Sequence, residues 1–354
     1  MSAEELAGRM FDASVAAMEL GTAYLGVKLG LYEALSTPKT ADELAAATGC
    51  APRYVREWLQ AQALSGLVTM DGTDVATARF ALADGVDEVL VEPTSPAYLG
   101  GVPHVFAALG VAMPALVEAY RTGAGVPYAE YGPDAVIGQA ALNRPAFVNS
   151  LVAEWLPEIP DVLARLRETA APARVADFGC GFGWSSIELA KAFPQIRVDA
   201  FDSDEASIAA ARRNAADHGV ADRIDFEVAD LAASGDGAPR YDVAFFFECV
   251  HDFPRPVEVL RHARGATKPD GTVIVMDEKA AETFSPPGDP VQRFLGAVSA
   301  LWCLPQGLVG TDPEPAGTLM RPDTLAGLAD RAGYRTTEIL PVNHDMWRFY
   351  RLVP

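Results

Sequence analysis

Two groups of residues in this 354-residue chain have types and spacing that could do chemistry. The first is an acid followed by alternating glycines, Asp177, Gly179, Gly181 and Gly183, directly after an apolar run. The second is the pair His251 and Asp252, shortly after the apolar run 241–247. Glycines let a backbone turn tightly and approach a ligand, and an imidazole titrates near neutral pH, so it can accept a proton from a reacting group.

The glycine turn lies between an expected strand, 174–178, and an expected helix that begins at Ser185. Strand, glycine turn and helix in this order open the nucleotide pocket of a doubly wound α/β fold. A dinucleotide site favours G-x-G-x-x-G, which would require glycine at position 184, but Trp184 stands there. Asp177 beside the turn suits a ligand with a cationic ammonium and a sulfonium better than it suits a pyrophosphate.

The pattern D-x-G-x-G-x-G resembles the first motif of class I S-adenosylmethionine (SAM)-dependent methyltransferases. The resemblance implies a Rossmann-like, mostly parallel sheet of seven strands, with SAM as cofactor and S-adenosylhomocysteine as product. The expected strands after the first are 196–201, 224–229, 241–247 and 272–276, with 336–340 and 346–352 at the edge.

Acids follow the second and third of these strands. Asp202, about 20 residues past the glycines, is placed to accept hydrogen bonds from ribose hydroxyls. Asp230 resembles the acid that pairs with the adenine amino group in the family, with Leu231 and Phe247 as further cofactor contacts. The alternative for either Asp is a helix N-cap or an ordinary loop acid.

His251 and Asp252 are the candidate catalytic residues. In plant-type and bacterial O-methyltransferases, which the chain resembles, this place often reads His-Asp, and the His deprotonates a hydroxyl. The resemblance therefore implies O-methylation of a small, largely apolar metabolite with His251 as general base, and N- or C-methylation is the nearest rival. Each residue also has a structural alternative. His251 could only position the substrate or be a polar residue at the rim, and Asp252 could cap a helix at Pro254.

A metal-assisted alternative uses the same residues. Some SAM enzymes that C-methylate 2-oxo acids resemble this architecture and hold a metal with a His-Asp pair and a second His. Here the only notable donor in the later insertion, 279–322, is Cys303, so no metal is assigned. His104, Trp302 and Cys303 are candidate substrate contacts, although a His in an apolar segment is also a common core residue.

The sequence predicts three segments. Residues 1–90 read as a winged-helix dimerisation domain, with helices at 2–20, 23–35 and 53–64, a capping box at Thr40–Glu43, and a hairpin of 66–70 with 78–82. Residues 91–170 look helical, and the family resemblance implies that they form a lid over the substrate pocket. Residues 171–354 are the expected catalytic domain.

The charge pattern limits the partners. The net charge is −20, and residues 1–90 hold six Lys or Arg against thirteen Asp or Glu, which argues against nucleic acid or an anionic membrane as partner. The resemblance to small-molecule methyltransferases implies a homodimer that acts on a small molecule, and the acidic start Met1–Leu6, which does not read as a signal peptide, predicts a cytoplasmic protein. Residues 93–117 carry no charge, but their four prolines favour a buried helix pair over a membrane span. A SAM fold used for sensing, for a non-methylating reaction or for transcriptional regulation remains an alternative.

Overall fold

The computed structural model describes residues 1–235 and 237–354. The chain forms two compact units, which are described separately here: 1–111 with 131–145, and 112–130 with 146–354. The expected middle segment, 91–170, is thus shared between the two units instead of forming one of its own.

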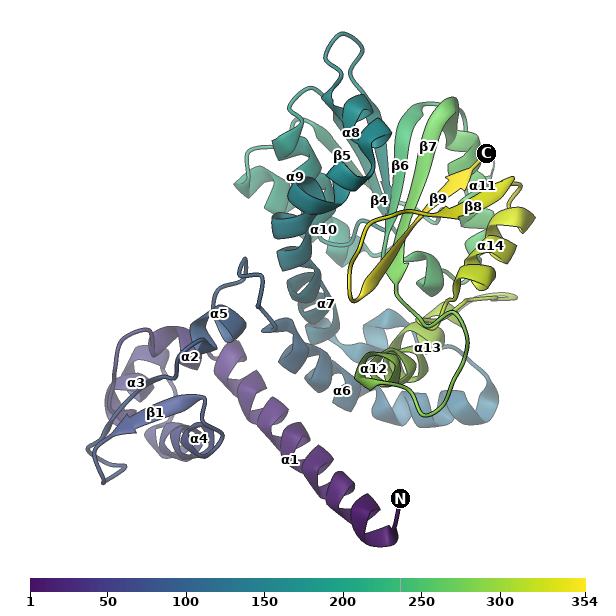
Figure 1. The fold of residues 1–354 in the computed structure, drawn as a ribbon. Coiled ribbons are helices and arrows are strands. Elements are labelled where there is room, and N and C mark those ends of the chain that lie inside the picture. Colours follow the sequence, from purple (N-terminus) through teal and green to yellow (C-terminus); the bar gives the residue numbers. More distant parts are fainter. Residues whose placement is uncertain (236) are drawn as a thin grey trace. The chain divides into compact units, whose positions relative to one another are not determined.

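The N-terminal unit begins with a winged helix (Figure 1). Its elements are α1 (Ala3–Lys28), α2 (Leu31–Ala34), α3 (Ala41–Thr48), α4 (Pro52–Leu64), β1 (Val68–Asp71), β2 (Arg79–Leu82) and α5 (Val86–Leu90). The predicted capping box is present, because Thr40 Oγ1 accepts from Glu43 N while Glu43 Oε2 accepts from Thr40 N. β1 and β2 pair antiparallel, and Tyr32, Trp58 and Phe80 fill the core beneath them.

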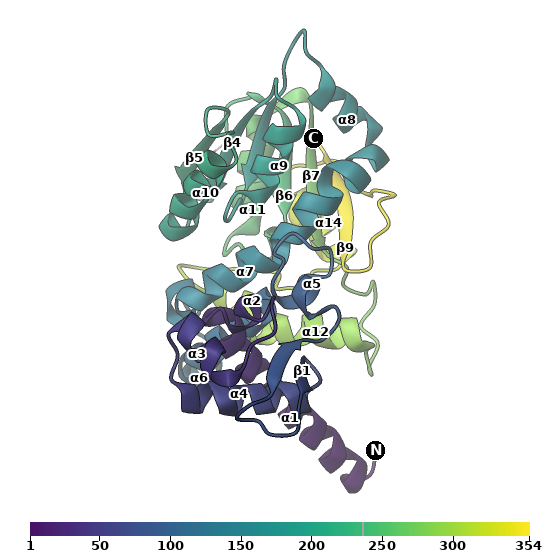
Figure 2. The same ribbon diagram turned by 90° about the vertical axis from the view of Figure 1, so that its left-hand side faces the viewer.

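The predicted pair of helices at 2–20 and 23–35 is wrong. α1 runs without a break through Gly21 and Thr22, and Figure 1 shows it as one continuous helix, whose N-terminal part is also clear in Figure 2. The Thr22 hydroxyl donates to the Glu19 carbonyl, so it does not interrupt the helix. The break comes at Gly30, whose φ of +66° is the left-handed conformation that commonly ends a helix.

Two longer helices complete the middle of the chain, α6 (Gly101–Thr122) and α7 (Pro133–Ala146), with the short η1 (Tyr128–Tyr131) between them. In the N-terminal unit they pack closely, because a Cβ added at Gly101 would lie 2.4 Å from the Gly138 carbonyl oxygen. Among the described residues, α6 is the one helix long and apolar enough to cross a membrane. That property is weak evidence of a span, since core helices share it.

The second unit contains the expected seven-stranded sheet, in the order β5-β4-β3-β6-β7-β9-β8. The strands are β3 (Arg174–Phe178), β4 (Arg197–Asp202), β5 (Ile224–Val228), β6 (Tyr241–Phe247), β7 (Thr267–Glu278), β8 (Thr336–Ile339) and β9 (Trp347–Val353). β3 to β7 are parallel, and β9 and β8 are antiparallel additions at one edge. The predicted fold class is confirmed.

Helices cover both faces of this sheet (Figure 1). One face packs against α8 (Pro160–Arg167), α9 (Trp184–Ala192), α10 (Glu205–Asp217) and η2 (Phe147–Trp155). The other face packs against α11 (Pro256–Ala266) and α14 (Pro322–Arg331). Because both faces are covered, β6 consists entirely of buried residues, as its unbroken apolar sequence requires.

The 279–322 insertion is partly helical, with α12 (Pro290–Val298), η5 (Ser299–Cys303) and α13 (Leu304–Gly307). Two main-chain hydrogen bonds join it to the loop after β6, from Glu314 N to Pro254 O (2.7 Å) and from Gly317 N to His251 O (3.0 Å). The insertion is therefore held against the carboxyl end of the sheet.

The order of the strands identifies where a ligand would bind. β3 pairs with β4 on one side and with β6 on the other, so the chain changes direction across the sheet at β3. Open α/β sheets bind their ligands beyond the carboxyl ends of the strands at such a switch point. The glycine turn, Asp202 and the His251 segment all follow strands at this end.

Candidate active site

The glycine turn after β3 has the backbone that its sequence predicts. Gly179, Gly181 and Gly183 all have φ between +51° and +78°, a region that side chains with a Cβ rarely adopt. A Cβ at Gly183 would lie 2.8 Å from the Phe226 ring, whereas one at Gly181 would meet nothing within 4 Å. Gly183 thus allows α9 to pack closely, and the backbone at Gly181 borders open space.

Asp177 lies under this turn and is buried. Its Oδ2 accepts from the hydroxyls of Ser185 (2.5 Å) and Ser186 (2.6 Å), both on α9. Its Oδ1 is also buried and has no hydrogen-bond donor among the described residues. Burial raises the pKa of Asp177 to about 6, although the two serine hydroxyls act in the opposite direction.

Asp202, at the end of β4, faces the turn. Its Oδ2 accepts from Gly181 N (2.8 Å) and its Oδ1 from Asp204 N (2.9 Å). The alternative of Asp202 as a helix cap is wrong, because Asp204 caps α10 by accepting from Ser207 N. Ribose binding by Asp202 stays a prediction, and its carboxylate can accept further hydrogen bonds.

The remaining expected cofactor contacts have varied surroundings. Asp230 is exposed and accepts from Ala232 N (3.0 Å), with Arg255 at 3.8 Å. Leu231 and Phe247 are both buried, but they belong to the hydrophobic clusters on opposite faces of the sheet. Their contacts with adenine stay predictions.

His251 is the centre of a buried group of acids. It lies in η4 (Val250–Asp252), directly beyond β6, and is 1% exposed. Its Nδ1 is 2.7 Å from Asp277 Oδ1 and 3.1 Å from Glu278 Oε2, and its Nε2 is 3.2 Å from Asp252 Oδ1. Burial lowers the pKa of His251, but the charges of Asp252, Asp277 and Glu278 outweigh burial and raise that pKa well above its usual range.

Asp277 and Glu278 form the end of β7 and were not singled out from the sequence. In the neutral ring, Asp277 holds the proton on Nδ1, so Nε2, which lies 3.2 Å from Asp252 Oδ1, is the nitrogen that can accept a proton. The available signal was their position, since two acids directly after the apolar run 272–276 follow the same rule that identified Asp202.

Glu248 is a second residue that the sequence did not identify as part of the site. Its φ of +52° is unusual for a residue other than glycine, and backbone strain of this kind clusters at functional sites. Trp347 Nε1 donates to its Oε1, while Oε2 is buried without a donor among the described residues. Burial raises the pKa of Glu248 to about 7.

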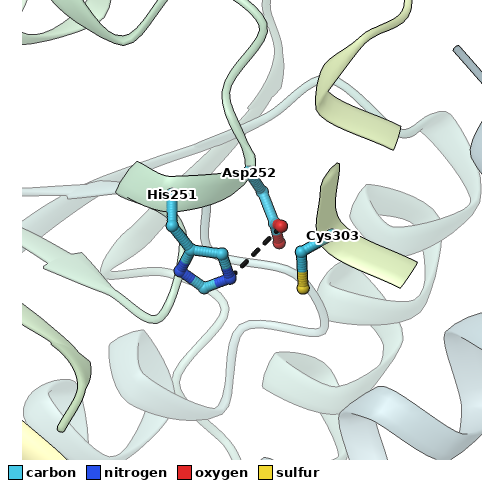
Figure 3. A group of neighbouring side chains, drawn as sticks. All are labelled: His251, Asp252 and Cys303. Atoms are coloured by element: carbon cyan, nitrogen blue, oxygen red, sulfur yellow. Dashed lines mark ion pairs between the residues drawn. The ribbon is translucent and has the colours of Figure 1, made fainter. Parts of the chain in front are cut away.

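The structure brings Asp252 and Cys303 to the same side of the imidazole (Figure 3). The alternative that Asp252 caps the next helix is wrong, because α11 begins at Pro256 with Arg255 as an N-cap that makes no side-chain bond. Cys303 comes from η5 in the insertion, and burial raises the pKa of its thiol to about 12. Trp302, its neighbour, meets the ring of Tyr128 edge-on at 6.1 Å.

His104 has a structural environment of its own in the N-terminal unit. Its Nδ1 is 2.7 Å from Asp134 Oδ1, and its ring meets Tyr24 edge-on at 5.5 Å. Asp134 also accepts from Tyr24 and Lys28. These contacts join α1, α6 and α7 and account for the burial of His104, whose role with substrate stays a prediction.

The residues around the switch point fit SAM. The unpartnered Oδ1 of Asp177 is an acceptor for the ammonium group, and the open space at Gly181 permits close approach of a ligand. Asp202 adds a carboxylate on the opposite side of the turn. When bound, SAM supplies an electrophilic methyl group on a sulfonium.

Comparisons with known proteins agree with this assignment. Residues 175–271 match the family described as a methyltransferase domain, and residues 16–87 match an Rv2258c-like winged HTH domain. A malonyl-[acyl-carrier protein] O-methyltransferase of Halalkalibacterium halodurans is 28% identical over 29% of this chain and 38% of its own length. The chain thus spans about two fifths of that relative.

Similar solved structures cover nearly the whole chain. The mitomycin 7-O-methyltransferase MmcR has a TM-score of 0.69 at 23% identity, over 99% of this chain and 98% of its own. PigF with SAH has a TM-score of 0.72 at 18% identity, over all of both chains. At these identities the similarity shows the fold. The chain therefore carries a SAM-dependent methyltransferase domain of class I and an N-terminal winged-helix domain, as the sequence predicted.

Proposed function

We propose that this protein transfers the methyl group of SAM to a hydroxyl oxygen of a small, largely apolar metabolite, with His251 as general base. The observation that carries the proposal is the arrangement of His251 at the carboxyl end of β6, with Asp277 on Nδ1 and Nε2 turned away from it. The names of MmcR and of the Halalkalibacterium halodurans relative support oxygen as the acceptor atom.

The proposed reaction needs in-line placement and removal of one proton. The acceptor oxygen forms a bond to the methyl carbon, the bond from carbon to sulfur breaks with its electron pair on sulfur, and S-adenosylhomocysteine leaves. The hydroxyl proton goes to Nε2 of His251. The resulting imidazolium is stabilised by Asp252, Asp277 and Glu278, which already surround the ring.

We propose that residues of the second unit line the substrate side of the site. Trp302, which precedes Cys303 in the chain, packs edge-on against Tyr128, and these aromatic rings favour a planar, mostly apolar acceptor. The acceptor end is also rich in carboxyl groups, which keeps N-methylation of an amine open as the rival reaction. In the N-terminal unit, exposed apolar residues along α1 favour a homodimer. The proposal also includes the cytoplasm as the place of the reaction and a free metabolite as its substrate.

The test is methyl transfer from labelled SAM to a panel of phenols, aliphatic alcohols, amines and 2-oxo acids. We expect labelled product with a hydroxylated acceptor and a large loss of turnover in His251→Gln, which preserves the size of the side chain but not the base. His218→Gln, at the C-cap of α10, is the matched control. Transfer to an amine or to carbon alone, with His251→Gln fully active, would contradict the proposal.

A further inference from the structure

Three potential metal ligands from two separate segments meet beside one imidazole (Figure 3). A ring nitrogen of His251, a carboxylate oxygen of Asp252 and Cys303 Sγ all lie within 4.8 Å of one another, and His251 Nε2 is 3.2 Å from Asp252 Oδ1. His251 and Cys303 are buried, and Asp252 is partly exposed, so an ion would have a route to the site. One carboxylate oxygen of Asp252, Oδ1, is buried, and among the described residues its one ion-pair partner is His251 Nε2 at 3.2 Å, without a hydrogen bond.

The other side of the imidazole is already held as a metal ligand requires. Nδ1 lies 2.7 Å from Asp277 Oδ1, and Asp277 is 1% exposed. Histidines that bind metals almost always donate their second ring N–H to a carboxylate or carbonyl, which orients the ring and makes the ligating nitrogen more basic. Nε2 is therefore the nitrogen available to an ion.

The backbone holds the two segments together. Gly317 N donates to His251 O at 3.0 Å, and a Cβ at Gly307 would lie 3.1 Å from Asp252 O, so α13 packs closely on η4. Cys303 is the last residue of η5, a π-helical turn. Such turns recur at functional sites because the extra residue redirects side chains.

We propose that His251 Nε2, Asp252 and Cys303 Sγ bind a divalent transition-metal ion such as zinc, and that the bound ion suppresses methyl transfer. Nitrogen, oxygen and sulfur ligands together favour zinc over magnesium or calcium, which prefer oxygen alone. Tetrahedral zinc ligands lie about 3.3–3.8 Å apart at the usual bond lengths, so side chains need to close by about 1–1.5 Å at most.

The charge of the site agrees with a cation. Asp252, Asp277 and Glu278 all form ion pairs with the single imidazole of His251. A divalent ion would compensate this excess of carboxyl groups. Binding releases the thiol proton of Cys303 to solvent, and three protein ligands leave a fourth position for water. The bound ion suppresses methyl transfer because it occupies the nitrogen that otherwise accepts the substrate proton. This inhibitory role, unlike the metal site itself, rests on the proposed function.

The binding test does not require activity. Cobalt(II) is titrated into the full-length, reduced protein, and absorption is followed for thiolate-to-cobalt charge transfer and for tetrahedral d–d bands. We expect one cobalt per chain, displaced by zinc. Cys303→Ser should abolish the charge-transfer band, and Asp277→Asn should weaken binding by about 10- to 100-fold. Cys50→Ser, in the N-terminal unit, should change nothing, and circular dichroism checks that each variant is folded.

A stoichiometric charge-transfer band that survives in Cys303→Ser, or no binding by a folded wild-type protein, would overturn the metal site. The suppression is tested separately, by adding zinc and then a chelator during methyl transfer. Reversible loss of activity that follows zinc occupancy supports it, and activation by zinc overturns it. If no acceptor is found, the cobalt titration still decides the site, so the two proposals can fail independently.

Discussion

His251 Nε2 is the atom on which the proposed chemistry depends. Three carboxyl groups raise the pKa of the imidazole well above its usual range, so the charged ring persists to higher pH than in a free imidazole. Only the neutral ring can accept a proton. We therefore predict that kcat/KM rises with pH along a limb whose midpoint lies above 6.5.

The control for this profile is Asp277→Asn, which keeps the shape of the side chain and removes one charge. Because a carboxylate beside an imidazole favours the charged ring, its loss should move the rising limb to lower pH. A wild-type profile without such a limb, or a limb that does not move in the variant, would contradict the role of His251 as base.

Asp177 carries a second prediction at this scale. Its pKa is raised from 3.8 to about 6 by burial, so the folded state binds the proton more tightly than the unfolded state. Its favourable contribution to stability is fully present below pH 3.8 and is lost as pH rises through about 6. At pH 8 the ionised carboxylate should cost about 3 kcal/mol, from about two units of pKa shift.

Asp177→Asn removes that charge and can keep one acceptor for Ser185 and Ser186. We expect the variant to be more stable than wild type at pH 8, by up to about 3 kcal/mol, and not at pH 4. Urea unfolding at both pH values measures this, and an equal destabilisation at the two would show that the estimate of the charge cost is wrong. The same variant should bind SAM more weakly, because the acceptor for its ammonium loses its charge.

At the scale of elements, the packing of the glycine turn against α10 and β5 can be isolated with a pair of glycines. Gly183 and Gly219 have similar left-handed φ values of +76° and +69°, but a Cβ at Gly183 would lie 2.8 Å from Phe226, and one at Gly219 would meet nothing within 4 Å. Alanine at either position should cost about 1–2 kcal/mol from backbone strain.

Gly183→Ala should cost about 1–3 kcal/mol more than Gly219→Ala, because its methyl group also displaces the Phe226 ring or Ala211 on α10. Thermal and urea unfolding of the two variants give the difference. Equal destabilisation would show that close approach at the turn contributes nothing.

Much of the second unit could be predicted from the sequence, because buried parallel strands are continuous apolar runs and their carboxyl ends carry the ligands. The run 241–247 coincides with β6, and the acids and glycines after the strands lie at the switch point as expected. The break in α1 was misplaced, since Gly21 inside a helix and Gly30 at its end look alike without their neighbours.

The grouping around His251 could be predicted only in part. His251 and Asp252 are adjacent in sequence, but Cys303 reaches them from a turn about 50 residues later, and Asp277 from the next strand. Such meetings depend on how the insertion packs, which one sequence does not reveal. For Asp230 the spacing in the sequence identified the residue, but the structure shows it exposed, with a hydrogen bond from Ala232 N and Arg255 nearby.

For the whole molecule, the proposed homodimer accounts for an unusual feature of α1. Phe11 and Met18 are 69% and 71% exposed, and Leu6, Met10, Val15 and Leu25 are also exposed. An exposed apolar surface of this kind favours a protein interface. We predict that wild type is a dimer by light scattering and that Phe11→Asp with Met18→Asp yields a monomer.

Asp12→Lys, also on the exposed surface of α1, is the control for a change of charge alone and should leave the dimer intact. The monomeric variant should still bind SAM, since the turn and Asp202 belong to the second unit. A wild-type protein that is a monomer by light scattering would contradict the proposed homodimer.

The central claim is that the switch point of the second unit binds SAM for transfer at His251. Its most direct test is calorimetric titration of SAM into the cofactor-stripped, full-length protein, with Asp202→Ala and the exposed Asp225→Ala compared in parallel. The account predicts one site per chain, binding weakened at least tenfold in Asp202→Ala, and binding unchanged in Asp225→Ala. A folded wild-type protein that binds no SAM, or an Asp202→Ala variant that binds it equally well, would contradict the account.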